Sequence, residues 1–241
     1  MTTATEMPDR AKANARNRTR SVLLRTLSCE LRGHVPFTAL GAVSGIAIML
    51  LLVATKAATD LSNALFYTSH PLHVVLSALV TTAMYRRHRV GGLWAGVLVG
   101  YSGSVGVATL SDAVMPFLGA RLLGVGMPLH LPFLEGETMA YVGVPVWILV
   151  NAAAAIGIAL GLLRPKTKLP HASHVLVSTW ASLFALTAFS PAGTDWLPLI
   201  PFVFVILVVA VWVPCCTSDI VYPLLWIRRG NGTPPACDHE H

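Results

Sequence analysis

Long runs of apolar residues are the feature of this sequence that most limits its fold. A helix needs about 20 apolar residues to cross the hydrocarbon core of a bilayer, which is about 30 Å thick. The 241-residue chain contains several such runs, and 12% of its residues are charged, against roughly 25% in soluble proteins. We expect six transmembrane helices, at residues 36–56, 71–86, 92–118, 139–163, 172–190 and 196–227. The sequence therefore predicts an all-α integral membrane protein.

The lysine and arginine residues predict how these helices are oriented. Cytoplasmic loops of membrane proteins carry an excess of both residue types. With a cytoplasmic N-terminus, 15 of the 17 fall in cytoplasmic segments, and only Lys56 and Arg121 fall outside. We therefore expect a multi-pass protein of the cell membrane with both termini in the cytoplasm. Residues 1–33 would form a basic, partly disordered N-terminal tail, and residues 230–241 would form a short C-terminal tail. The net charge of +6 follows from this topology, so the expected partner is the lipid bilayer and not a nucleic acid.

Three short motifs that each occur twice, in the same order, indicate an internal duplication. They are His-x-Pro-Phe at 34–37 and 130–133, His-x-x-His-Val-x-x-Ser at 70–77 and 171–178, and Ser-Asp-x-Val-x-Pro-x-Leu at 111–118 and 218–225. A general resemblance between apolar helices would not repeat His, Asp and Pro. A further shared patch pairs Gly45 with Gly157. Each half, 34–121 and 122–229, holds three helices, which predicts two inverted three-helix repeats, an architecture known from transporters.

The inversion divides the repeated polar residues into two groups of equal composition, one near each membrane face. The outer group is His70, His73, Asp112 and His130, and the inner group is His34, His171, His174 and Asp219. Histidines three residues apart lie on the same face of a helix, so each such pair could hold one ion. Imidazoles with a carboxylate suit zinc, iron, manganese, cobalt, nickel or copper. We therefore expect each group to bind a transition-metal ion, and His and Asp could also carry protons.

Further ligands and backbone groups could complete these sites. The additional candidates are Cys215, Cys216, Ser77 and Ser178. Ordinary packing is the alternative for the cysteines, and a helix cap or interfacial position is the alternative for the histidines and for Asp112. Pro116 lacks an N–H group, and we expect it to free the carbonyl of Asp112, four residues earlier.

These features favour a transporter or permease for a cation, above all a divalent transition metal, over an enzyme. No Gly-x-x-x-x-Gly-Lys-Ser/Thr loop for a nucleotide is present in the sequence. The alternatives are a membrane-embedded zinc-type hydrolase, a two-haem transmembrane electron carrier and a structural subunit of a larger complex. Small residues along the third helix allow close packing, either within the repeat interface or across a homodimer.

Overall fold

A computed structural model describes residues 35–54, 58–87, 92–139, 143–163, 170–216 and 222. Most of these residues are helical, and among them the one β-type contact is an isolated bridge between Thr138 and Pro145. The two predicted tails, His34 and Asp219 lie outside the described residues. The side chains of His171 and Cys216 also lie outside them, although the backbone of both residues is helical.

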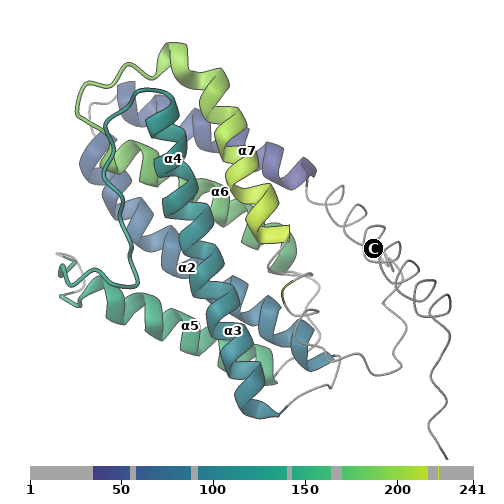
Figure 1. Cartoon of the computed structure of the whole chain (residues 1–241). Helices are drawn as coiled ribbons and strands as arrows, with labels where there is room; N and C mark the ends of the chain where they lie inside the picture. Colours follow the sequence, from purple (N-terminus) through teal and green to yellow (C-terminus); the bar gives the residue numbers. More distant parts are fainter. Residues whose placement is uncertain are drawn as a thin grey trace, which may run out of the picture.

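The helices follow the six predicted apolar runs (Figure 1). In chain order they are a first helix at Val35–Ala54, α2 at Ala58–Arg87, α3 at Leu93–Thr109, the π-helical η1 at Leu110–Val114, α4 at Met115–Leu122, α5 at Val146–Leu163, α6 at Pro170–Phe189, the 3-10 turn η2 at Leu197–Leu199 and α7 at Ile200–Cys216. Because α3, η1 and α4 form one continuous rod, the described part of the chain has five helices long and apolar enough to cross a membrane, and α6 carries a shorter apolar stretch, Ser173–Phe189. The predicted all-helical, multi-pass membrane class is thereby confirmed.

The second helix differs most from its prediction, because α2 begins at Ala58 and not at residue 71. Pro71 lies inside the helix. Prolines inside membrane helices are tolerated, because neighbouring helices, hydroxyl side chains and local adjustments satisfy the backbone groups that the proline frees. His70 and His73, which we expected to open this helix, therefore lie in its interior. His73 is the middle residue of the 27-residue apolar stretch Asp60–Arg86, which puts it roughly 20 Å along the helix from either end.

The third membrane-spanning rod contains a π turn at the repeated Ser-Asp motif. The N–H of Met115 donates to the carbonyl of Leu110, five residues earlier, which leaves the Ser111 carbonyl without its usual helical donor. Pro116 has no N–H to replace that donor. The Ser111 carbonyl instead accepts a hydrogen bond from the Ser182 hydroxyl of α6, at 3.0 Å. The prediction that Pro116 frees the carbonyl of Asp112 is therefore wrong. The carbonyl that lacks a helical donor is that of Ser111, because the π turn shifts the hydrogen bonds by one residue. Such turns occur frequently at functional sites.

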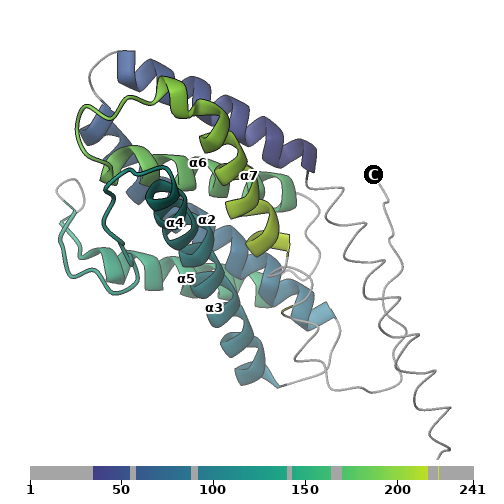
Figure 2. The ribbon, with the colours of Figure 1, turned by 45° about the horizontal axis from the view of Figure 1, so that its top comes forward.

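Glycines bring the outer helices onto α2 and α6, which pack against each other at the centre of the bundle. The first helix and α5 lie on opposite sides of this central pair (Figure 1 and Figure 2). A Cβ atom at Gly157 of α5 would overlap the Val75 carbonyl oxygen of α2, and one at Gly41 of the first helix would lie 2.9 Å from the Thr179 hydroxyl of α6. Small residues permit this close approach between membrane helices.

Candidate metal centre

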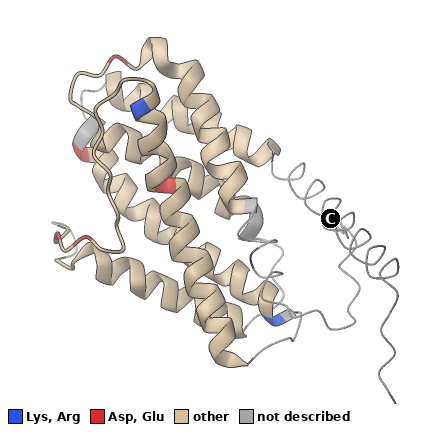
Figure 3. Cartoon of the chain, viewed as in Figure 1, with Lys and Arg blue, Asp and Glu red and all other residues tan. Residues whose placement is uncertain are grey.

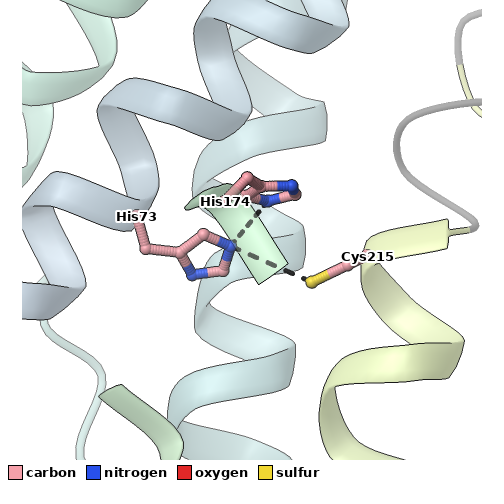
Figure 4. Close-up of side chains that lie close together, drawn as sticks. All are labelled: His73, His174 and Cys215. Atoms are coloured by element: carbon pink, nitrogen blue, oxygen red, sulfur yellow. Dashed lines mark hydrogen bonds between the residues drawn. The ribbon is translucent and has the colours of Figure 1, made fainter. Parts of the chain in front are cut away.

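Two histidines and a cysteine from three helices meet in the interior of the bundle (Figure 4). His73 of α2, His174 of α6 and Cys215 of α7 each offer a ligand atom, and these atoms lie within 4.8 Å of one another. The Nε2 atoms of the two histidines are 2.8 Å apart, and the Cys215 Sγ lies 3.9 Å from the His73 Nε2. Both histidines are 0% exposed and the cysteine is 1% exposed. The cluster is thus sealed from solvent by the surrounding helices.

A single carboxylate orients the histidines of α2. Most charged side chains of the described residues lie near the ends of the bundle (Figure 3). Among these residues, Asp112 is the one Asp, Glu, Lys or Arg that is buried, and it is fully buried. Its Oδ2 accepts from the Nδ1 of His70 at 2.9 Å and from the Nδ1 of His73 at 2.7 Å. Its Oδ1 accepts from the hydroxyls of Ser111 at 2.7 Å and Ser178 at 3.0 Å. An ionised carboxylate has about four acceptor positions, and all four are used here.

This arrangement fixes which nitrogen of His73 can bind a metal. A carboxylate only accepts, so His73 must carry its proton on Nδ1, and in the neutral ring Nε2 is left with a lone pair. That Nε2 faces His174 and Cys215 (Figure 4). Metal-binding histidines commonly donate their other N–H to a carboxylate, which sets the ring orientation and raises the basicity of the ligand. Asp112 occupies this supporting position.

The donor set fits a borderline or soft metal ion. Zinc binds histidine nitrogen at about 2.0–2.1 Å and cysteine sulfur at about 2.3 Å in a tetrahedron, which separates two nitrogens by roughly 3.3 Å and a nitrogen from a sulfur by roughly 3.6 Å. The two nitrogens would therefore move apart by about 0.5 Å, and the sulfur would approach by up to about 1 Å. Two imidazoles and a thiolate suit zinc or copper better than manganese or magnesium, which prefer oxygen.

The predicted site residues are distributed differently from the expected two groups. His70, His73 and Asp112 of the outer group lie together, but His174 of the inner group is in direct contact with them through His73. The expected separation into two faces assumed that His73 begins a helix, and its position at the middle of α2 removes that separation. The other predicted residues fall into three cases. Ser178 and Cys215 lie at the centre, Ser77 is buried without a hydrogen-bond partner among the described residues, and His34, Asp219 and the side chains of His171 and Cys216 are not described.

His130 lies apart from the centre, in the loop between α4 and α5. Its Nδ1 pairs with the Oε1 of Glu135 at 2.9 Å, and its ring stacks on Phe189 with 3.8 Å between ring centroids. The hydroxyl of Tyr67 donates to the Oε2 of Glu135 at 2.8 Å. Partial burial raises the pKa of Glu135, but the hydrogen bonds from His130 and Tyr67 outweigh it, and the pKa lies below its ordinary value of 4.5. His130 and Glu135 are called the loop pair below.

Three residues of these sites were not predicted from the sequence. Ser111 binds Asp112, and the repeated Ser-Asp dipeptide was a signal that could have identified it. Glu135 and Tyr67 bind each other across 68 residues of chain. No local pattern connects them, so only the folded structure reveals the pair.

Comparisons of the chain with protein-family models, with curated proteins and with solved structures found no match.

Proposed function

We propose that this chain is a membrane transporter for a divalent transition-metal cation, which binds between His73, His174 and Cys215. The observation that carries the proposal is the meeting of these three ligands at the middle of α2, supported by the buried carboxylate of Asp112. Ionisable residues inside a membrane are costly to bury and generally mark ion pathways or relays. Transporters built from inverted repeats hold their cargo near the membrane midplane, at the repeat interface.

The histidine contact supports the two inverted repeats. His73 and His174 occupy the same position of the repeated His-x-x-His-Val-x-x-Ser motif, 101 residues apart, and they touch through the same atom, Nε2. Equivalent residues of two related halves meet in this way where a twofold axis passes between them. A cation bound by both histidines would then lie on that axis.

Helix contacts support the same repeat with a second set of residues. A Cβ at Gly41 or Gly45 of the first helix would contact α6, and one at Gly157 or Gly161 of α5 would contact α2. The α6 contacts are Leu176, Thr179, Trp180 and Leu183, and the α2 contacts are Val75, Ala78, Leu79, Thr82 and Ala83. The first four of these α2 positions each lie 101 residues before one of the four α6 positions, as in the histidine motif, and Ala83 has no such counterpart. These contacts pair Gly41 with Gly157 and Gly45 with Gly161, one helical turn away from the pairing that the sequence patch suggested.

The alternatives receive less support from this geometry. A zinc-type hydrolase would need its substrate to reach the metal, whereas all three ligands are buried. A haem between His73 and His174 would need a porphyrin between two nitrogens that are in hydrogen-bond contact. A small cation is the cargo that this site can accept.

Flux measurements in proteoliposomes test the proposal. Purified chain is expected to move radioactive zinc or cobalt across the vesicle membrane. Replacement of Asp112 by Asn, or of its repeat counterpart Asp219 by Asn, should each slow the flux at least tenfold. Asp60→Asn is the matched control, because Asp60 is an exposed carboxylate at the start of α2. Absence of flux for every first-row divalent metal, with the helices intact by circular dichroism, would overturn the proposal. An enzyme would instead lose its activity through only one of the two aspartates.

A further inference from the structure

The loop pair is separated from the buried centre by a short stack of aromatic rings. His130 stacks on Phe189, Phe189 contacts Phe66 edge-to-face with 5.1 Å between centroids, and Phe66 stacks on His70 at 5.4 Å. His70 in turn binds Asp112. Two histidine–carboxylate pairs therefore stand on either side of the Phe66–Phe189 contact.

The loop pair is open to solvent, whereas the residues beneath it are closed. The side chains of His130 and Glu135 are 27% and 16% exposed, whereas Phe66 and His70 are 0% exposed. Tyr67, which binds Glu135, precedes His70 by three residues, or about 4.5 Å along α2. The loop pair is thus tied to α2 one helical turn before the first buried histidine.

His70 has a nitrogen available for an incoming ion. Its Nδ1 is used by Asp112, which leaves Nε2 on the other side of the ring with a lone pair when the ring is neutral. This Nε2 is fully buried and has no hydrogen-bond partner among the described residues. A buried polar atom without a partner is costly and calls for a functional or structural explanation.

We propose that the loop pair is a second metal-binding site, which receives a divalent transition-metal cation from solvent and passes it to His70 when the Phe66–Phe189 contact opens. An imidazole nitrogen and a carboxylate oxygen suit zinc, cobalt, nickel or iron(II). The passage to His70 rests on the proposed transport function, whereas binding at the loop pair does not. The Tyr67 hydrogen bond keeps the Glu135 carboxylate in place beside His130.

Cobalt(II) binding to the purified full chain in detergent tests the site directly. Cys29, Cys216 and Cys237 are replaced by Ser, and His239 and His241 by Gln, so that fewer competing ligands remain. A cobalt–thiolate charge-transfer band reports occupation of the centre at Cys215, and the loop pair has no sulfur to produce it. The chain is expected to bind one cobalt with this band and a further cobalt without it.

Variants assign the second cobalt. Glu135→Gln or His130→Ala should weaken its binding at least tenfold and leave the thiolate band unchanged. Glu137→Gln is the matched control, since Glu137 is an exposed carboxylate of the same loop. The proposal is overturned if the only cobalt bound is the one that Cys215→Ser removes, or if Glu135→Gln binds cobalt as the control does. Absence of flux with both sites occupied would instead count against the transport function alone.

Thiol labelling tests the aromatic barrier. Cys215 is labelled in proteoliposomes with a small, membrane-impermeant thiol reagent, in the same background chain. Phe189→Ala and the milder Phe66→Leu are expected to speed the labelling about tenfold, because either change opens the contact between the two rings. Phe202→Ala is the matched control, since Phe202 is 57% exposed on α7. If both variants keep the thiolate band but are labelled no faster than the control, the Phe66–Phe189 contact is not a barrier to Cys215.

Discussion

Replacement of Asp112 by Asn should weaken metal binding at the centre without removing any metal ligand. The side chain keeps its size, but it loses its charge and one acceptor oxygen. The amide group can face Ser111 and Ser178, whose hydroxyls can rotate to accept a hydrogen bond. The remaining oxygen then still accepts from the Nδ1 atoms of His70 and His73, now without the charge.

The magnitude follows from the bond to the ligand His73. A hydrogen bond to a charged group contributes about 1.5–3 kcal/mol and one to a neutral group about 0.5–1.5 kcal/mol. The loss at His73 is therefore about 1–1.5 kcal/mol, which corresponds to about tenfold in Kd. Where the ring also changes tautomer, Nε2 carries the proton and no longer binds metal, and the loss approaches the hundredfold limit seen for such supporting residues.

Cobalt titration with the thiolate band as the signal measures this effect. The Kd of Asp112→Asn is expected to rise by about 10–100-fold, with circular dichroism showing the same helix content. Asp60→Asn should bind as the unmodified chain does, because Asp60 is exposed at the start of the same helix. A Kd for Asp112→Asn within twofold of the control would show that the carboxylate does not support His73, and the assignment of its role would be wrong.

Three further predictions concern the ligand set, the helix packing and the loop. Cys215→Ser replaces the soft ligand by a hard one, so competition titrations should show zinc affinity falling at least tenfold, about 1.4 kcal/mol, and manganese affinity falling less. Gly157→Ala should lower the free energy of unfolding by about 1–3 kcal/mol, because the new Cβ overlaps the α2 backbone and lies 2.6 Å from the Ala78 Cβ. Thermal melts in detergent measure this loss. The control is Gly106→Ala, where a new Cβ meets nothing within 4 Å. The lowered pKa of Glu135 stabilises the fold above its ordinary value of 4.5, and this contribution is lost as the pH falls through the lower folded value. The melting temperature should therefore fall more steeply below pH 4.5 in the unmodified chain than in Glu135→Gln, and parallel curves would contradict this.

The number and class of the helices could be predicted from apolar runs, whereas their ends could not. The segment before His70 contains Asp60 and several hydroxyl and amide side chains, which lower its hydropathy, and Pro71 resembles the first residue of a helix. Both signals predicted a start at residue 71. The helix begins at Ala58 because backbone groups in a bilayer must bond within the helix, and this requirement outweighs the side-chain polarity and the proline.

The sequence predicts which residues form the buried centre. Which of them meet depends on how deep each lies in the membrane, and the sequence does not show that depth. Repetition in the sequence identified His73, His174 and Asp112, and the spacing of His70 and His73 placed both on one face of α2. The loop pair was different, because the contact of Glu135 with Tyr67 joins residues that no repeat and no helical spacing connect. Local periodicity predicts which side chains share a helix face, and contacts between distant segments need the packed structure.

The position of His73 explains why residues from both expected groups meet. If His73 began a helix at the outer face, its repeat counterpart His174 would begin one at the inner face, and the two would lie a membrane apart. His73 instead lies at the middle of the apolar stretch of α2, and its Nε2 lies 2.8 Å from the Nε2 of His174. In the proposed transporter, a site shared by both halves would suit alternating access better than two separate sites, because one cation could stay bound while the halves rock around it. Cys215 then has a distinct consequence. Its counterpart in the proposed first repeat is Ala108, so in the proposed site the thiol would give a soft ligand to one half only.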